Sequence, residues 1–391
     1  MRPSTRSDRL RLAALVAALA VTLLAADLVV AWRVRGEETA ETGFEHGEEV
    51  RVLPREPADL PPPEPRPSLL LLGNSHTYAL PGLAKGEPLR PDAGATVIDD
   101  LASGVKDLFP TSDAVFDRLS YPNFLPFEML TRYAQLSFAG YRPRVVVLGI
   151  TWRNVARDRQ LRHQVHLTYE IPGLTEQLLG RLERPDLGAD PRVLAAARAE
   201  ERQVEEDRRR DRQRSSADRF EARLDDTLGR RVALIGDSAE VRARVYRELA
   251  YAIDTWLVPE QDRGYSYDLI EDDLELNVAS LEVLFRWLAE DGAKVIVYRA
   301  PERSDLAPLL DPRREDEVLG GLETYARSLG FVTVDARDAV PAELWGWERD
   351  TPDRSHFTEP GHLLLARRLL AAGSEHGVWA ALGDPESHAL Q

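Results

Sequence analysis

Three side chains in this sequence have the types needed for acyl transfer. Ser75 lies in the polar turn Gly73-Asn74-Ser75, directly after the apolar run 69–72. Asp353 stands three residues before His356, near the end of the chain. A serine hydroxyl, an imidazole base and an orienting carboxylate together can transfer acyl groups through a covalent serine ester. The sequence therefore predicts Ser75, Asp353 and His356 as catalytic residues.

Each of these patterns also has a structural explanation. A Gly-Asn-Ser turn after a strand can simply begin a helix, with Asn or Ser as the N-cap. A second serine, Ser238, lies in the similar run 232–238, but the second strand with its glycine, which the pattern requires, is not correctly placed between Ser238 and His356. Asp237 and Glu240 resemble a capping box, which explains that run structurally. We therefore favour Ser75 as the nucleophile.

The elements that must position these residues alternate along the chain after Pro67. Short runs rich in Leu, Ile and Val predict strands, and helical apolar spacing predicts helices between them. Strands that alternate with helices pair in parallel and are covered on both faces. We therefore predict a three-layer α/β/α sandwich with a five-stranded parallel sheet, its strands at 69–72, 95–98, 145–148, 295–298 and 332–335 and its main helices at 124–139 and 276–289.

The candidate residues follow the predicted strands. Ligands of open parallel sheets bind beyond the carboxyl ends of the strands. Ser75 follows the first predicted strand, Gly104 the second and residues 151–154 the third, so we expect all of them on one rim with Asp353 and His356. Two arginines follow the fourth strand, and we expect them to be solvated or ion-paired there: Arg299 and Arg303.

These motifs resemble those of the SGNH (GDSL-type) hydrolase superfamily, especially its membrane-anchored members related to O-acyl transfer on polysaccharides and cell walls. Gly73-Asn74-Ser75 resembles the first block, and Asp353 with His356 resembles the Asp-x-x-His block before a C-terminal helix. The resemblance implies a flavodoxin-like fold. It also implies an oxyanion hole that includes the backbone N–H groups of Ser75 and Gly104.

The third block departs from that family's pattern. The family has Gly-x-Asn-Asp, whereas this chain has Gly149-Ile150-Thr151-Trp152-Arg153-Asn154. Thr151 takes the place of the oxyanion asparagine in strict register, and Asn154 is the alternative after a longer turn. The loss of one oxyanion donor typically lowers the rate by about 10²–10³.

The N-terminal segment predicts a membrane anchor. Residues 12–32 are nearly all Ala, Leu and Val, about the length that a helix needs to cross a bilayer. Four arginines precede the segment, so we expect a single-pass plasma-membrane protein with a cytoplasmic N-terminus, residues 1–33 forming the cytoplasmic tip and anchor, and an extracytoplasmic catalytic domain. A cleaved signal peptide is the alternative.

The remaining chain divides by composition. Residues 34–67 are acidic and then proline-rich, which predicts an extended tether. Residues 68–391 form the predicted catalytic domain, with a charged helical insertion at about 155–272. The segment Glu200 to Arg231 carries opposite charges four residues apart, typical of a solvent-exposed helix.

Composition limits the partners. The formal charge of −16 argues against nucleic acid as a partner, because phosphate binding needs clustered Lys and Arg. The chain has no cysteine, so it holds no disulfide, thiolate metal site or cysteine nucleophile. His163, His166 and Glu170 have a spacing that suggests a metal, but we expect a surface pair. We predict no metal and no cofactor.

The sequence thus predicts a membrane-anchored serine esterase or O-acyltransferase that acts outside the cytoplasm. Its expected substrate is an acyl ester of a polysaccharide, of the cell wall or of a lipid-linked glycan. The alternative is a catalytically degraded scaffold that binds a membrane-protein partner through the helical insertion.

Overall fold

The structure, a computed structural model, is described here for these residues: 50–53, 66, 68–87, 90–91, 94–121, 124–156, 174–185, 187–199, 202, 271–308, 311–348 and 351–383. All of them belong to one unit that spans Phe44–Glu206 and Ser266–Gln391.

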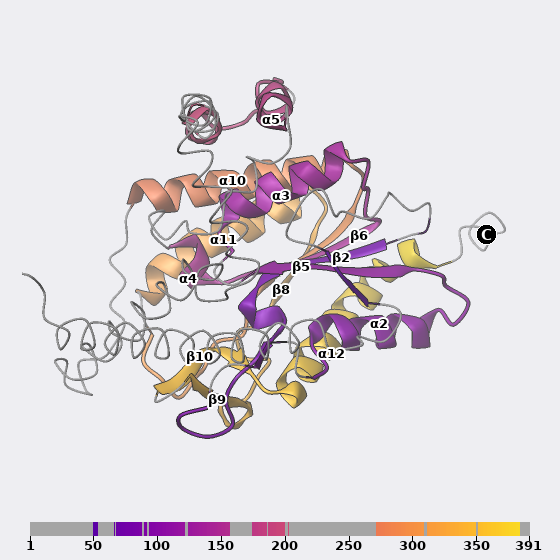
Figure 1. The fold of residues 1–391 in the computed structure, drawn as a ribbon, viewed down its shortest axis with the longest axis vertical. Helices are drawn as coiled ribbons and strands as arrows, with labels where there is room; N and C mark the ends of the chain where they lie inside the picture. The colour runs from indigo at the N-terminus through magenta and orange to yellow at the C-terminus, as the bar shows by residue number, and fades with distance from the viewer. Residues whose placement is uncertain are drawn as a thin grey trace, which may run out of the picture. The chain divides into compact units, whose positions relative to one another are not determined.

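The unit is built on a parallel sheet of six strands (Figure 1). The strands follow one another across the sheet in the order β1-β5-β2-β6-β7-β8. Strand β2 therefore lies between β5 and β6, and its residue Leu69 pairs with Phe116 on one side and Val145 on the other. The strands are β1 (Val50–Val52), β2 (Ser68–Asn74), β5 (Val115–Tyr121), β6 (Val145–Ile150), β7 (Lys294–Arg299) and β8 (Val332–Asp335).

Strand β2 shows why the apolar runs form the middle of the sheet. Leu70 and Leu72 join one hydrophobic cluster with helix residues that include Leu130, Leu281 and Leu319. Leu69 and Leu71 join a second cluster with helix residues that include Val97 and Leu365. Because side chains alternate along a strand, a run of four leucines supplies both clusters. All four side chains are fully buried.

Five long helices cover the two faces of the sheet, which gives the three layers seen in Figure 1. Helices α3 (Pro126–Phe138), α10 (Glu271–Glu290) and α11 (Pro312–Ser328) lie on one face, and α2 (Val97–Leu108) and α12 (Glu359–Glu375) lie on the other. The smaller elements are η2 (Ser75–Thr77), β3 (Ala79–Leu80), β4 (Arg90–Pro91), α4 (Trp152–Val155), α5 (Leu174–Leu182), η5 (Ala342–Leu344), β9 (Trp345–Glu348), β10 (Thr351–Phe357) and η6 (Trp379–Leu382). The predicted α/β class and parallel sheet are confirmed.

The predicted strand at 95–98 is wrong. Val97 and Ile98 are instead the first residues of α2, and both are fully buried. The backbone N–H of Thr96 donates to the carboxylate of Asp99 at 2.8 Å, which stabilises the first turn of this helix. The strand that pairs with β2 in the main sheet is instead β5. Its side chains Val115, Phe116 and Leu119 are buried in the core.

The sheet has six strands rather than five because β1 adds an edge. Residues Val50–Val52 lie in the predicted tether, yet they pair in parallel with β5. Arg51 Nε donates to Asp117 Oδ1 at 2.8 Å, and the carboxylate of Asp117 is fully buried. The folded unit therefore includes residues before position 68, which corrects the predicted boundary.

Several predictions lie outside the described residues. They include the anchor at 1–33, the charged helix from Glu200 to Arg231, Ser238, and the pair His163 and His166 with Glu170. Among the helices that are described, none is long and apolar enough to cross a membrane. Within the predicted insertion, α5 contributes buried Leu178 and Leu182 to the core, so this part packs against the sandwich.

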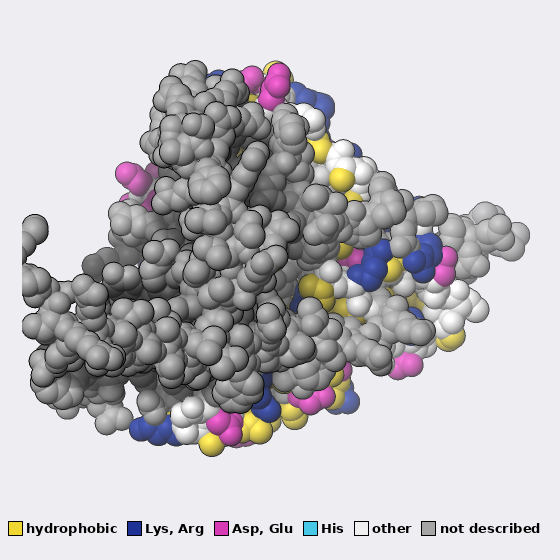
Figure 2. Space-filling model, viewed as in Figure 1, with side chains coloured by type: hydrophobic (Ala, Val, Ile, Leu, Met, Phe, Trp, Pro, Cys, Tyr) yellow, Lys and Arg dark blue, Asp and Glu magenta, His cyan; other side chains and the backbone are white. Residues whose placement is uncertain are grey.

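The face drawn in Figure 2 carries both basic and acidic side chains among its described residues. Neither sign covers this part of the surface alone.

Candidate active site

Ser75 lies at the carboxyl end of β2, in a tight turn. Asn74 caps η2 by accepting a hydrogen bond from His76 N at 3.2 Å. The hydroxyl of Thr77 returns to the strand end and donates to Asn74 O at 2.8 Å. A Cβ on Gly73 would lie 2.4 Å from Thr77 Cγ2, so the residue here must be a glycine for the chain to turn this sharply. The turn leaves Ser75 partly exposed.

Asp353 and His356 come from β10, just before α12. The pairing of β10 with β9 shifts register between Pro352 and Phe357, which frees the intervening backbone from the ladder. Asp353 Oδ1 accepts hydrogen bonds from Ser355 N at 2.7 Å and from His356 N at 2.9 Å. This local turn holds the carboxylate and the imidazole close together.

The structure brings the three predicted residues into one hydrogen-bonded chain. His356 Nε2 lies 2.8 Å from Ser75 Oγ. His356 Nδ1 lies 3.0 and 2.9 Å from the two carboxylate oxygens of Asp353. Asp353 is fully buried, so its charge faces the imidazole rather than water. With Nδ1–H donated to Asp353, the free Nε2 can accept the proton of the serine hydroxyl.

A second histidine supports the nucleophile turn. His76 is buried, its Nδ1 contacts Asn74 Oδ1, and its Nε2 lies 3.1 Å from Tyr298 OH. Burial, followed by the nearby His362 and His356, lowers the pKa of His76 to about 3, so this ring is neutral. A neutral ring that donates from Nδ1 accepts at Nε2 from the tyrosine. A Cβ on Gly149 would lie 2.5 Å from Tyr298 OH, so glycine at 149 makes this contact possible.

Replacement of Tyr298 by Phe is expected to destabilise the fold by about 1–3 kcal/mol, because a buried acceptor on His76 loses its donor. Urea unfolding of the purified protein measures this change. Tyr325→Phe is a matched control, since the structure gives the Tyr325 hydroxyl no hydrogen bond among the described residues, and its effect should stay within about 0.5 kcal/mol. Equal effects of the two substitutions would contradict the role given to the Tyr298 hydroxyl.

The third-block residues form a second chain of hydrogen bonds. Asn74 Nδ2 donates to Thr151 Oγ1 at 3.1 Å, and Thr151 Oγ1 donates to Asn154 Oδ1 at 2.9 Å. Asn154 Nδ2 donates to Phe124 O at 2.7 Å. The one hydroxyl proton of Thr151 is therefore committed, whereas the amide of Asn154 has a second N–H. Of these two predicted alternatives, Asn154 is the one that keeps a side-chain donor.

The structure does not place Gly104 at a strand end. Gly104 lies within α2, and a Cβ on it would approach Leu370 Cδ1 of α12 to 2.2 Å. The glycine thus permits the close contact of two helices on the far face of the sheet. The expected position of Gly104 followed from the wrong strand at 95–98, and Gly104 is not among the residues that line the cavity at Ser75.

Ser75 opens into a cavity of about 680 Å³ along the carboxyl ends of the strands. Arg153 and Ser355 lie in its wall, where Arg153 Nη1 donates to Ser355 Oγ at 2.7 Å and so links α4 to β10. Arg153 stands inside the third-block segment, but the sequence alone does not predict its contact with β10. Arg299 and Arg303 are ion-paired, as predicted, with Asp316 and Glu323 and with Asp305 respectively.

Comparisons with known proteins found only distant similarity. No family model and no curated protein matches the chain. An α/β hydrolase, LAE5, from the metagenome of Lake Arreo has 15% identity and a TM-score of 0.38, with 80% of this chain and 96% of that chain covered. A family two carbohydrate esterase from Clostridium thermocellum, in complex with cellohexaose, has 12% identity and a TM-score of 0.38, with 82% and 67% covered.

The acetylxylan esterase Axe2 from Geobacillus stearothermophilus has 12% identity and a TM-score of 0.38, with 80% of this chain and 95% of that chain covered. At these identities and TM-scores, the likeness assigns neither a family nor an activity to this chain.

Proposed function

We propose that this protein is a serine hydrolase or acyltransferase of ester bonds, with Ser75 as nucleophile, His356 as general base and Asp353 as the orienting carboxylate. The observation that carries the proposal is the unbroken chain from Ser75 Oγ through both ring nitrogens of His356 to Asp353. A serine, a histidine and a buried carboxylate in this geometry are the parts that activate a hydroxyl nucleophile.

In the proposed reaction, Ser75 Oγ attacks the ester carbonyl while its proton passes to His356 Nε2. The tetrahedral oxyanion then forms hydrogen bonds with the backbone N–H of Ser75 and with Asn154. The N–H of Ser75 is suitable because the first N–H groups of a helix have no partner within it. The protonated His356 gives its proton to the departing alcohol, and the acyl group passes from Ser75 to water or to a second alcohol.

The proposed substrate is an acyl ester of a polysaccharide, of the cell wall or of a lipid-linked glycan. The cavity beyond Ser75 supports a substrate with a polar alcohol part, because charged side chains such as Glu302, Arg337 and Arg354 line it. Acetate release from an O-acetylated xylan or cello-oligosaccharide tests this substrate class. We expect release that Ser75→Ala removes. No turnover of acetylated saccharides or small acetyl esters by folded protein would contradict the proposal.

We further propose that residues 12–32 anchor the protein, with the catalytic unit outside the cytoplasm. The apolar run and the preceding arginines support this arrangement. A reporter that is active only outside the cytoplasm, fused after Gln391, should be active in cells, and the full-length chain should sediment with membranes. A shorter chain released into the soluble fraction would instead indicate a cleaved signal peptide.

A further inference from the structure

The cavity that contains Ser75 extends along the sheet beyond the ends of β7 and β8. There its lining includes Glu302, which follows β7, and Glu315, in the first turn of α11. Asp335 and Arg337 from the end of β8 line the same region. The alcohol part of an ester bound at Ser75 would extend into this part of the cavity. The charges of its lining therefore influence which substrate is bound.

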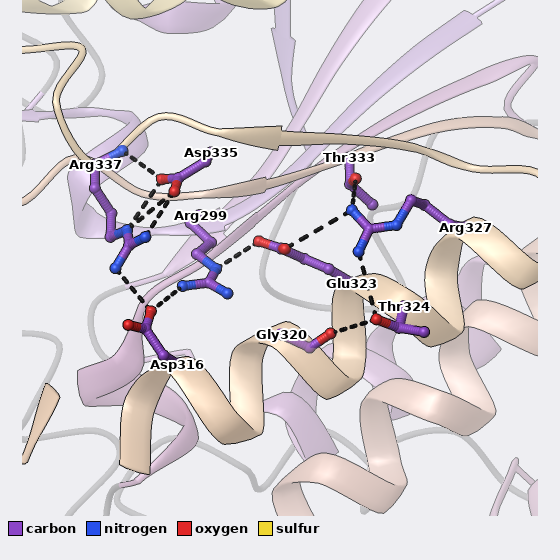
Figure 3. A network of polar contacts seen from close by, with 9 residues as sticks. All are labelled: Arg299, Asp316, Gly320, Glu323, Thr324, Arg327, Thr333, Asp335 and Arg337. Atoms are coloured by element: carbon purple, nitrogen blue, oxygen red, sulfur yellow. Dashed lines mark hydrogen bonds and ion pairs between the residues drawn. The ribbon is translucent and has the colours of Figure 1, made fainter. Parts of the chain in front are cut away.

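Several carboxylates at or near this wall have an arginine partner, as Figure 3 shows for Asp316, Glu323 and Asp335. Arg299 Nη1 binds Asp316 at 2.8 Å, and Arg337 binds Asp316 at 2.9 Å and Asp335 at 2.7 Å. Asp338, on the same wall, pairs with Arg368 at 2.7 Å. These fixed ion pairs leave little net charge where they lie.

Glu302 and Glu315 are different, because they face each other. Among the described residues, neither carboxyl has an ion pair with Lys, Arg or His, and the side chain that contacts the Glu315 carboxyl by a hydrogen bond is that of Glu302. Glu315 is only 6% exposed, and its Oε1 has no hydrogen-bond partner. Ionising both of two facing carboxyl groups costs much free energy when one of them is buried, because the like charges repel each other and one is removed from water.

The electrostatics of the pair follow from this arrangement. Burial, together with the hydrogen bond to Glu302 and the charge of Glu302, raises the pKa of Glu315 to about 8. The charges of Arg337 and Arg299 oppose the shift, as does the N-terminal end of α11, but they are outweighed. Near neutral pH the carboxyl group of Glu315 therefore keeps its proton.

We propose that Glu302 and Glu315 form a binding site for an organic ammonium group on the ester substrate or the acceptor alcohol. A primary ammonium carries the positive charge and the N–H donors that two facing carboxyl groups lack, and it would displace the proton of Glu315. A metal ion fits less well, since the described part of the chain has no group of three or more His, Asp or Glu side chains arranged to hold one. The role in substrate choice rests on the proposed function, whereas the binding itself does not.

Calorimetry on the Ser75→Ala protein tests the site without turnover. The probes are 6-amino-6-deoxy-D-glucose and D-glucose, which differ only in an ammonium in place of a hydroxyl. We expect the amino sugar to bind roughly 10–100-fold more tightly, the range of a charge-assisted contact. Its binding should release a proton near neutral pH, and its affinity should rise between roughly pH 6 and 8, because the proton competes with the ligand below the raised pKa of Glu315.

Two variants identify the residues responsible. Glu315→Gln imitates the protonated carboxyl permanently, so proton release should disappear and the amino sugar should bind no better than glucose. Glu302→Gln removes the exposed partner with little risk to folding and should act in the same direction. Asp338→Asn is the matched control, because it removes a carboxylate of the same wall that already has an arginine partner, and the preference for the amine should persist.

Equal affinity for the two sugars, or an amine preference unchanged in both glutamine variants, would overturn the inference. Labelling of Ser75 in the unsubstituted protein by a serine-reactive phosphonate reports separately on the proposed function. Labelling without amine preference refutes this site alone, and amine preference without labelling refutes the esterase proposal alone.

Discussion

Replacement of Ser75 by Ala is expected to lower ester turnover by roughly 10⁴–10⁶ while the protein stays folded. The loss is large because the hydroxyl oxygen is the atom that would bond to the substrate. Among the described residues, the Ser75 hydroxyl forms a hydrogen bond only with His356 Nε2, so its removal breaks no hydrogen bond within β2 or η2. Steady-state turnover of an acetyl ester and urea unfolding of the same samples measure the two effects.

Ser355→Ala is the matched control for this substitution. Ser355 also lines the cavity, two residues from Asp353, and its hydroxyl accepts a hydrogen bond from Arg153. Its backbone N–H, which binds Asp353, is retained in the variant. Activity should therefore fall at most severalfold. An equal loss in Ser355→Ala and Ser75→Ala would contradict the assignment of the nucleophile.

Replacement of Asp353 by Asn is expected to lower kcat/KM by roughly 10²–10⁴. The amide oxygen must still accept from Ser355 N and His356 N, as Asp353 Oδ1 does. The NH₂ group then faces His356 Nδ1, which must become an acceptor, so the proton moves to Nε2. An Nε2–H cannot accept the proton of Ser75.

Steady-state kinetics and urea unfolding of purified Asp353→Asn separate this effect from misfolding. The variant should still unfold in one cooperative transition, because the carboxylate and the amide have nearly the same volume. Turnover close to that of the unsubstituted protein would show that Asp353 does not orient the base.

The sequence predicted the elements whose pattern is strongly apolar. The leucine run of β2 and the valine-rich run of β6 lie in the centre of the sheet, where both faces are buried, so only apolar residues fit there. The turn at Ser75 and the Asp353–His356 spacing were visible because both depend on local hydrogen bonds. The contact between Ser75 and His356 could be predicted because both residues were expected at the carboxyl ends of the parallel strands.

The wrong predictions, the strand at 95–98 and the position of Gly104, have one physical cause: polar side chains are buried in the sheet. Strand β5 contains Asp117 and Arg118, both buried, so its apolar alternation is interrupted. Asp117 is satisfied by Arg51 and Tyr141, which lie far away in the sequence. The apolar start of α2 predicts a strand instead, and the expected position of Gly104 is wrong with it. The facing of Glu302 and Glu315 likewise depends on tertiary contact between a strand end and a helix start.

Labelling with a serine-reactive fluorophosphonate, followed by mass spectrometry of the peptides, reports directly on whether Ser75 is an activated nucleophile. One phosphonate per chain, attached to Ser75, is expected, and the Ser75→Ala and His356→Ala proteins should not be labelled. Attachment to Ser238 or another serine, or no labelling of folded protein at all, would contradict the proposed triad.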